Sequence, residues 1–263
     1  MNMRAPEGVI LLAAGSGTRL APLTDNCHKA LLPIAGSPVL KFIIDKILSV
    51  GVEDVVVVTG HRHDDIETFV RQQYADRVRC VFNVRYKDDI NILSMDLGVN
   101  SLRDPDAGYM VVETDMVIEP RGWGMVLDIE DRSRSFWATR GRYSVALTGG
   151  TLHADASGRV TDLVYRPYYD SACEGWLKLL GILYVGSAQV VADRSIRRAA
   201  MDKSIAQYYM MPWVENLAQL PCLARDLGDV YAVSYNDMAA YRRADEEYTR
   251  ILRTQGACKC RSR

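Results

Sequence analysis

The chain lacks any run of apolar residues long enough to span a bilayer, and its first residues do not have the layout of a signal peptide. It also lacks an excess of either charge, because 32 lysines and arginines face 33 aspartates and glutamates. Nothing therefore favours nucleic acid or a membrane as a partner. We expect a soluble, cytoplasmic protein.

Cysteines are few and none forms a C-x-x-C pair, which argues against a metal site and favours reduced thiols. The six lie at positions 27, 80, 173, 222, 258 and 260. We expect the Cys27 thiol to take no part in the chemistry of its loop. Cys258 and Cys260 belong to a basic tail, which we expect to be a frayed terminus without a function.

Internal repeats, low-complexity segments and linkers rich in proline or glycine are also missing from the 263 residues. The hydrophobic fraction of 48% and the charged fraction of 25% are those of an ordinary globular protein. The sequence therefore predicts a single domain over residues 1–263.

The first half of the chain alternates short apolar strands with amphipathic helices. We expect strands at residues 9–14, 55–59, 78–82 and 109–113, and helices at residues 39–50, 64–74 and 92–102. Because the first strands have no polar face, both faces of their sheet must be covered. This order predicts an α/β fold of the Rossmann-like class, with a mainly parallel sheet and helices on both faces.

The pattern changes after about Pro120, where the predicted strands become shorter and are separated by turns. We expect strands at residues 135–140, 144–147, 160–164 and 180–185, and helices at residues 195–209 and 236–253. We interpret this half as an elaboration of the same domain.

A loop with two glycines follows the first strand, where parallel α/β sheets bind their ligands. It consists of Leu12, Ala13, Ala14, Gly15, Ser16, Gly17, Thr18 and Arg19. The glycines let backbone N–H groups approach phosphate oxygens. A Walker loop would need Gly-Lys-Ser/Thr here, and Leu20 disfavours the fingerprint of a Rossmann oxidoreductase. By itself, the loop is equally compatible with a plain tight turn.

Residues 12–36 extend the loop into a longer pattern that includes Arg19, Pro22, Thr24, Lys29 and Pro33. It resembles the signature of the sugar-nucleotide pyrophosphorylase and cytidylyltransferase superfamily, L-A-A-G-x-G-x-R-x-x-P-x-T-x-x-x-P-K-x-L-x-P-x-x-G. The resemblance implies the nucleotide-diphospho-sugar transferase fold. It also implies an enzyme that joins a nucleoside monophosphate from an NTP to a small phosphorylated acceptor and releases pyrophosphate.

On this reading, the single domain has three parts. The nucleotide-binding core would cover about residues 8–120, the acceptor-side elaboration about 121–235, and the C-terminal helix and tail 236–263.

His28 stands where most of the superfamily has a proline before the lysine. With it, the segment resembles the branch that contains the phosphocholine cytidylyltransferases and their phosphonate-activating relatives. Val58-Thr59-Gly60 and residues 82–86 and 91–94 are similar to the same branch, and the likeness is thin beyond residue 120. The branch implies CTP as the donor, although the residues alone do not separate C from U.

The resemblance also assigns roles in the site. Arg19 and Lys29 would offset the negative charge of the triphosphate and, with Asp115, would be the catalytic residues. Residues 12–19, Asn83 and Ser94 would bind the nucleotide, and the Asn83 amide can both donate to and accept from a base.

Asp115 follows an apolar strand in the position of the family's catalytic aspartate, where a carboxylate can hold Mg²⁺. In this family a second carboxylate usually comes from the C-terminal half. We expect Glu215 to supply it, because residues 212–216 resemble the segment that does so, and Asp237 is the alternative. Mg²⁺ is therefore the expected cofactor.

The acceptor is expected to contact Tyr86, Asn91, Glu113, Arg140 and Trp213. Glu113 lies two residues before Asp115, so that the two share a face of their strand. The aromatic residues form no convincing cage for choline, and the segment 140–142, Arg-Gly-Arg, favours a more anionic acceptor such as a phosphonate.

Two other functions stay open. One is a sugar-1-phosphate nucleotidyltransferase that uses UTP, dTTP or GTP, and the other is a non-catalytic nucleotide-binding protein with the same fold. A homodimer is also left open.

Overall fold

The computed structural model describes residues 4–260, and the side chains from residue 4 to residue 255. Strand β1 (Gly8–Ala13) lies inside the main sheet, between β4 (Asp54–Thr59) and β6 (Gly108–Glu113), and runs parallel to both. Strand β5 (Arg79–Phe82) adds a further parallel strand beyond β4. All residues of β1 and β4 are buried, as expected for a sheet with both faces covered.

The rest of the main sheet is antiparallel for the most part. Strand β11 (Leu177–Gly186) runs antiparallel to β6, β8 (Ser135–Arg142) and β9 (Gly149–Ala154). Strand β10 (Val160–Arg166) pairs antiparallel with β9, and β12 (Cys222–Asp226) pairs parallel with β8. Within the described part of the chain, this sheet has nine strands.

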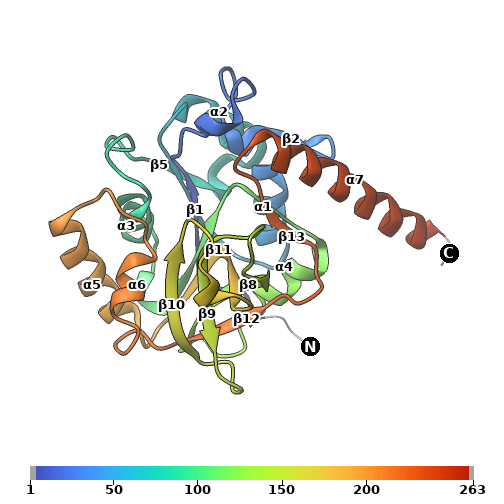
Figure 1. Cartoon of the computed structure of the whole chain (residues 1–263). Helices are drawn as coiled ribbons and strands as arrows, with labels where there is room; N and C mark the ends of the chain where they lie inside the picture. Colours follow the sequence, from blue (N-terminus) through green and yellow to red (C-terminus); the bar gives the residue numbers. More distant parts are fainter. Residues whose placement is uncertain (1–3, 261–263) are drawn as a thin grey trace.

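Helices cover both faces of the sheet, as predicted (Figure 1). The residues of β1 alternate between two hydrophobic clusters, with Val9 and Leu11 in one and Ile10 and Leu12 in the other. The first cluster includes residues of α1 (Val39–Ser49), α2 (His63–Tyr74), α4 (Pro120–Leu127) and α7 (Met238–Cys260). The second includes residues of α3 (Ile92–Asn100), α5 (Val190–Lys203) and α6 (Met211–Glu215). The predicted fold class is confirmed.

Two short pairs of strands lie outside the main sheet. One is β2 (Pro33–Ile34) with β3 (Ser37–Pro38). In the other, β7 (Met116–Ile118) pairs with β13 (Ala232–Ser234), which brings the residues before α7 to the end of β6.

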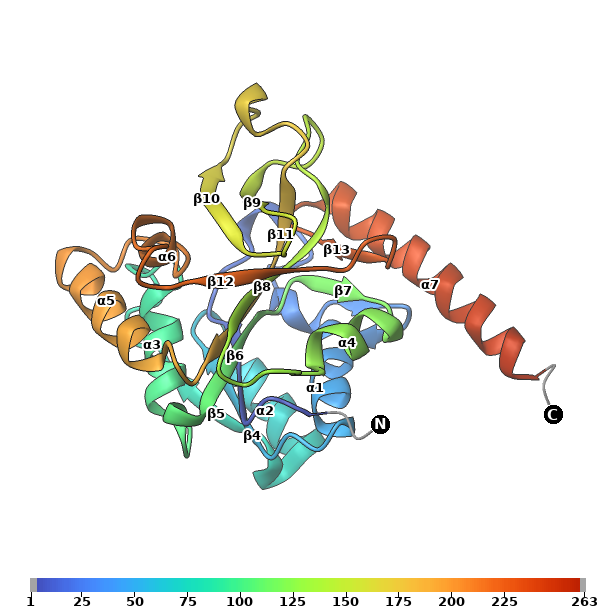
Figure 2. The same cartoon turned by 90° about the horizontal axis from the view of Figure 1, so that it is seen from below.

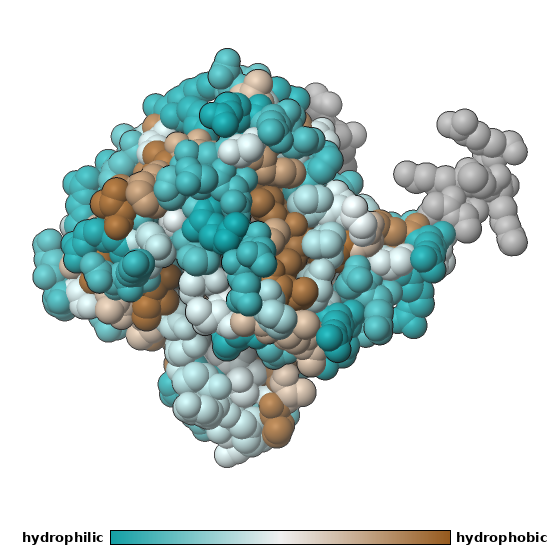
Figure 3. Space-filling model, turned by 90° about the horizontal axis from the view of Figure 1, so that it is seen from above, coloured by the Kyte–Doolittle hydropathy of each residue, from teal (hydrophilic) through white to brown (hydrophobic). Residues whose placement is uncertain are grey.

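Helix α7 follows β13 and extends from the body as an arm, seen most clearly in Figure 2. The face of the arm in Figure 3 carries mostly hydrophilic residues. None of the described helices is long and apolar enough to cross a membrane.

Several predicted boundaries in the second half are wrong. Residues 144–147 form a turn closed by one isolated bridge, because their backbone folds on itself instead of pairing with a neighbouring strand. The helix expected at 195–209 is α5, which begins at Val190 and ends at Lys203. Strands β9 and β12 and the short helices α4 and α6 were not predicted. The side chains of Cys258 and Cys260 lie outside the described residues.

Candidate active site

The carboxyl ends of β1 and β6 open onto a cavity of about 1190 Å³. Leu12 and Glu113 are register partners at these two strand ends, so the loops that follow begin side by side. Both loops contribute to the cavity wall, as expected where parallel strands end.

The loop after β1 folds back against Lys29. Gly17 has a φ of +63°, and a Cβ at this position would stand 3.1 Å from the Cβ of Lys29. The Thr24 hydroxyl donates to the Gly17 carbonyl at 3.1 Å and closes the fold of the loop. Position 17 therefore favours glycine, both for its backbone conformation and for its close approach to Lys29.

His28 fixes the turn that presents Lys29. Its Nδ1 accepts a hydrogen bond from the Ala30 amide at 3.1 Å, which caps the 3₁₀ turn Lys29–Leu31. The imidazole is fully buried, and burial, followed by the charge of Lys29, lowers its pKa to about 4. His28 is therefore neutral at pH 7 and holds the backbone instead of contacting the cavity.

Lys29 and Asp115 meet in the cavity. The Lys29 Nζ lies 2.8 Å from Asp115 Oδ2, and the Asp115 side chain is 8% exposed. The second carboxylate oxygen, Oδ1, is buried and has no hydrogen-bond partner among the described residues. An unpartnered carboxylate oxygen beside a polar cavity fits a divalent cation.

The segment between β13 and α7 closes the cavity over this pair. The Tyr235 amide donates to the Asp115 carbonyl at 2.9 Å, and its hydroxyl donates to the Lys29 carbonyl. The next residues, Asn236 and Asp237, line the cavity. Arg19 also lines the cavity and donates from Nη2 to Asn236 Oδ1 at 3.1 Å.

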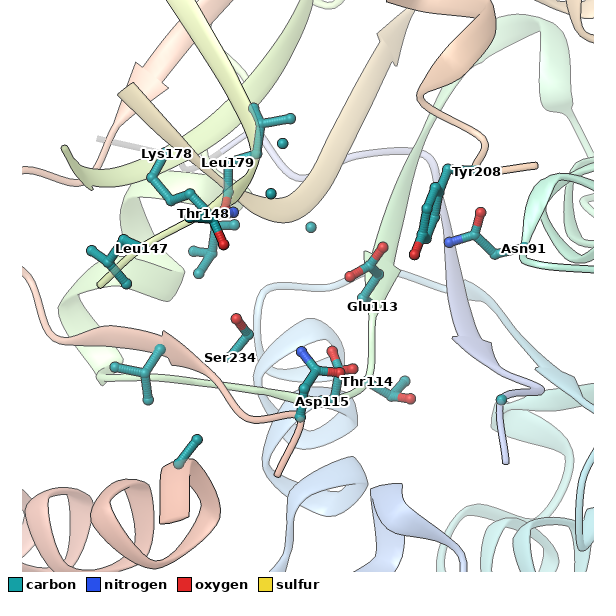
Figure 4. A pocket seen from close by; sticks show the side chains of 18 of the residues that line it. Asn91, Glu113, Thr114, Asp115, Leu147, Thr148, Lys178, Leu179, Tyr208 and Ser234 are labelled. Carbon is teal, nitrogen blue, oxygen red and sulfur yellow. The ribbon is translucent and has the colours of Figure 1, made fainter. Parts of the chain in front are cut away.

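Glu113 occupies the middle of the cavity in Figure 4, with Asp115 on one side and Lys178 and Thr148 on another. Burial, followed by the charge of Asp115, raises its pKa to about 7, against the opposing charges of Lys29 and Lys178. Gly181 has a φ of +76°, and a Cβ there would stand only 2.7 Å from Glu113 Oε2. Gly181 thus provides the space in which the carboxylate lies.

The opposite wall comes from α3 and the loop after α5. Asn91 and Ser94 line the cavity, and Asn91 Oδ1 accepts from the Tyr209 amide at 2.8 Å. Tyr208 faces the same space beside Asn91 (Figure 4).

A family model for nucleotidyl transferases matches residues 8–195. The chain belongs to the nucleotidyl transferase family. It is 32% identical over 106 residues to the choline-phosphate cytidylyltransferase of Streptococcus pneumoniae. The matched stretch is 40% of this chain and 43% of that protein. It is 33% identical over 109 residues to the 2-aminoethylphosphonate cytidylyltransferase of Lancefieldella rimae, with 41% and 43% covered.

These matches span less than half the length of each relative. The folds agree over a longer stretch. A solved structure of a CTP:phosphocholine cytidylyltransferase from Streptococcus pneumoniae superimposes with a TM-score of 0.77 and 21% identity. It covers 92% of this chain and 99% of that one, and the likeness concerns the fold.

The structure of this nucleotidyl transferase brings together most of the residues predicted for its site. Those that line the cavity are Leu12, Ala14, Gly15, Arg19, Lys29, Asn91, Ser94, Glu113, Asp115, Arg140 and Asp237. Ala13, Ser16, Gly17 and Thr18 belong to the same strand and loop but do not line the cavity.

Asn83 is placed differently from the prediction. Its Nδ2 donates to Asp89 and to the Ser94 hydroxyl, and its Oδ1 accepts from the Arg85 amide. The side chain is fully buried and lies outside the cavity lining. In this nucleotidyl transferase it holds the loop before α3, and Ser94 is the member of this network that reaches the cavity.

Trp213 and Glu215 are also corrected. Trp213 is fully buried, donates from Nε1 to Asp193 Oδ1 at 3.0 Å, and packs on Trp137. Its indole is thus a core residue that cannot contact an acceptor. Glu215 is exposed at the end of α6 and does not line the cavity, whereas Asp237 does.

Tyr86 lies near the rings of His61 and Phe82 and is also outside the cavity lining. Conversely, sequence reasoning did not find Thr148, Lys178, Tyr208 or Asn236 as cavity residues. No local motif marks them, because each comes from an irregular loop or from a strand of the second half.

Proposed function

We propose that the chain transfers CMP from CTP to a small phosphate or phosphonate acceptor and releases pyrophosphate. The observation that carries the proposal is the contact between Lys29 and Asp115 in the cavity beyond the ends of β1 and β6, with one Asp115 oxygen that has no partner among the described residues. The relatives named as cytidylyltransferases for choline phosphate and for 2-aminoethylphosphonate support the donor and the acceptor class.

In the proposed reaction, an oxygen of the acceptor attacks the α-phosphorus of CTP, and the bond from that phosphorus to the bridging oxygen of pyrophosphate breaks. No covalent intermediate on the protein is needed. Lys29 would place a positive charge where the two anions meet, and the exposed Arg19 side chain would exchange Asn236 for the phosphates that leave. The chain thus contributes positioning and charge compensation.

Asp115, together with Asp237, would hold Mg²⁺, since the cation prefers a few carboxylate oxygens and retains several waters. When bound, Mg²⁺ would supply further neutralisation of the phosphate charges. In the described residues, no three carboxylate, histidine or cysteine side chains cluster as a complete metal cage, which agrees with a site completed by water and substrate.

The nucleotide would lie along Leu12, Ala14 and Gly15, with Asn91, Ser94 and Tyr208 on the opposite wall. Backbone groups of the loop and the Ser94 hydroxyl offer donors and acceptors for a pyrimidine edge. The acceptor would enter from the side of Glu113 and Arg140.

The test is pyrophosphate release by the purified protein with Mg²⁺. CTP, UTP, ATP, GTP and dTTP are each combined with phosphocholine, phosphonates and sugar 1-phosphates. We expect release with CTP and a small phosphate or phosphonate. Release with a sugar 1-phosphate and UTP, dTTP or GTP instead would favour the sugar-nucleotide alternative, and binding of nucleotide without release from any pair would favour the non-catalytic one.

A further inference from the structure

Arg140 and Lys178 line the cavity together with Glu113. Arg140 lies on β8 and Lys178 on β11, which are neighbouring antiparallel strands. The register places Leu177 opposite Arg142 and Leu179 opposite Thr139. Arg140 and Lys178 therefore come from the same short stretch of paired strand and face the same space.

Neither cation has an acidic partner within salt-bridge distance in the described part of the chain. Among the described residues, the one hydrogen-bond acceptor of Lys178 Nζ is the carbonyl of the next residue, Leu179, at 2.9 Å. The Arg140 Nε is buried and has no hydrogen-bond partner in the same part of the chain. Both side chains are half-buried. Charges that are partly removed from water are usually paired, so two unpaired cations facing one cavity indicate a site for an anion.

The electrostatics of the two residues agree with this geometry. Burial, followed by the charge of Arg140, lowers the pKa of Lys178 to about 8, and Glu113 opposes this only in part. Burial also lowers the pKa of Arg140. A bound anion would offset both effects.

The backbone leaves room for a ligand at this point. Gly149 has a φ of +107°, and a Cβ there would stand 3.5 Å from Lys178 Nζ. Thr148 lies beside Lys178 at the cavity wall in Figure 4. Thr148, Gly149 and Lys178 all line the cavity, so a ligand within it can reach the ammonium.

The position of the two cations tells which end of an acceptor they face. In the proposed reaction, the α-phosphorus lies beside Lys29 and Asp115, whereas the charged neighbours of Lys178 are Arg140 and Glu113. In Figure 4, Lys178 and Asp115 lie on different sides of the cavity, and Glu113 faces the same space. The cations are thus placed for a group remote from the reacting oxygen.

We propose that Arg140 and Lys178 bind a carboxylate at the end of the acceptor opposite its phosphate or phosphonate. This inference rests on the proposed function and narrows its acceptor to a molecule with an anionic group at both ends. A guanidinium matches a carboxylate with two parallel hydrogen bonds, and the ammonium adds a third. The same cations would repel the trimethylammonium group of choline.

The test compares acceptors of matched length with CTP and Mg²⁺. The substrates are 3-phosphonopropionate, 2-aminoethylphosphonate, propylphosphonate and phosphocholine, and kcat/KM is measured from pyrophosphate release. We expect the highest kcat/KM for 3-phosphonopropionate. In Lys178→Met, this value should fall roughly 10- to 100-fold relative to that for propylphosphonate, because a charge-assisted contact is lost. Lys203→Met, an exposed lysine at the end of α5, is the matched control and should change neither value.

Two outcomes overturn the inference. If Lys178→Met lowers kcat/KM equally for 3-phosphonopropionate and propylphosphonate, the cations serve the common phosphonate. If the wild-type protein prefers phosphocholine or 2-aminoethylphosphonate, the acceptor group that faces Arg140 and Lys178 is not an anion.

Failure of the proposed function is recognised separately, because no acceptor would then support pyrophosphate release. In that case, calorimetric titration of 3-phosphonopropionate into the wild type and Lys178→Met decides the site by itself. Binding that is weakened in the variant supports it, and equal or absent binding in both proteins contradicts it.

Discussion

At the scale of single residues, the proposed chemistry depends most on Lys29, whose ammonium contacts Asp115 in the cavity. We expect Lys29→Ala to reduce kcat by about 100-fold or more, as removal of a preorganised charge typically does. The measurement is steady-state pyrophosphate release, with thermal melting to verify the fold and Lys203→Ala as the control. Turnover like that of the wild type would remove Lys29 from the mechanism.

Asp115 makes a second prediction at this scale. Asp115→Asn retains the shape of the side chain but loses the charge that attracts a cation. We expect the Mg²⁺ concentration for half-maximal turnover to rise by about tenfold or more. A titration of activity with Mg²⁺ checks this, and an unchanged Mg²⁺ dependence would show that Asp115 is not the ligand.

His28 predicts a dependence of stability on pH. Its pKa is about 4 in the folded protein, below the ordinary value of 6.5. The unfolded chain therefore takes up a proton first as the pH falls, and the folded state loses up to about 3 kcal/mol between pH 6.5 and pH 4. His28→Asn retains an acceptor for the Ala30 amide and should not show this loss.

Urea denaturation of both proteins at pH 7 and pH 4.5 measures the difference. We expect the wild type to lose more free energy of unfolding than His28→Asn over this interval. Parallel losses in the two proteins would mean that His28 is not held neutral by the fold.

At the scale of elements, α3 lies close to the sheet because it carries a glycine. A Cβ at Gly98 would overlap the side chain of Ile10 on β1 and stand 3.1 Å from Val58 on β4. We expect Gly98→Ala to destabilise the protein by roughly 1–3 kcal/mol, the usual cost of overpacking.

Gly124 in α4 is the matched control, because its Cβ would meet no atom within 4 Å. Gly124→Ala should stabilise the protein by about 0.5–1 kcal/mol through helix propensity. Thermal denaturation measures both variants, and a neutral Gly98→Ala would show that α3 can shift away from β1.

The elements of the first half were predictable for a simple reason. The segments that became β1 and β4 are apolar on both faces, and α1 has its buried residues at helical spacing. The second half lacks such signals. Strand β12 returns from beyond α6 to pair with β8, a partner more than 80 residues earlier, and no local pattern encodes that pairing.

At the scale of the whole molecule, the cavity is assembled from segments distant in the sequence. Lys29 and Asp115 are 86 positions apart, and Arg19 contacts Asn236 across 217 positions. Lys29 and Asp115 could each be named as candidate site residues, because one belongs to the pattern that follows the first predicted strand and the other ends a later strand, whereas their contact was not predicted. The place of Lys178 could not be predicted, because it depends on how β11 lies against β6 and β8.

The errors at Trp213 and Glu215 have a similar cause, because contacts with distant segments decide where α6 lies. The segment resembled one that supplies a metal ligand, yet α6 packs its tryptophan into the core beside Asp193 and Trp137. Asp237 reaches the cavity instead, because β13 pairs with β7 directly after Asp115. The motif thus pointed to a carboxylate that the fold places outside the cavity.

The most direct test of the central claim is ³¹P NMR of a reaction that contains the protein, CTP, Mg²⁺ and a phosphonate acceptor. We predict two new, mutually coupled phosphorus signals from the joined α-phosphate and phosphonate, which increase together with the signal of inorganic pyrophosphate. Unchanged CTP, or CMP and pyrophosphate without the coupled pair, would contradict transfer to the acceptor.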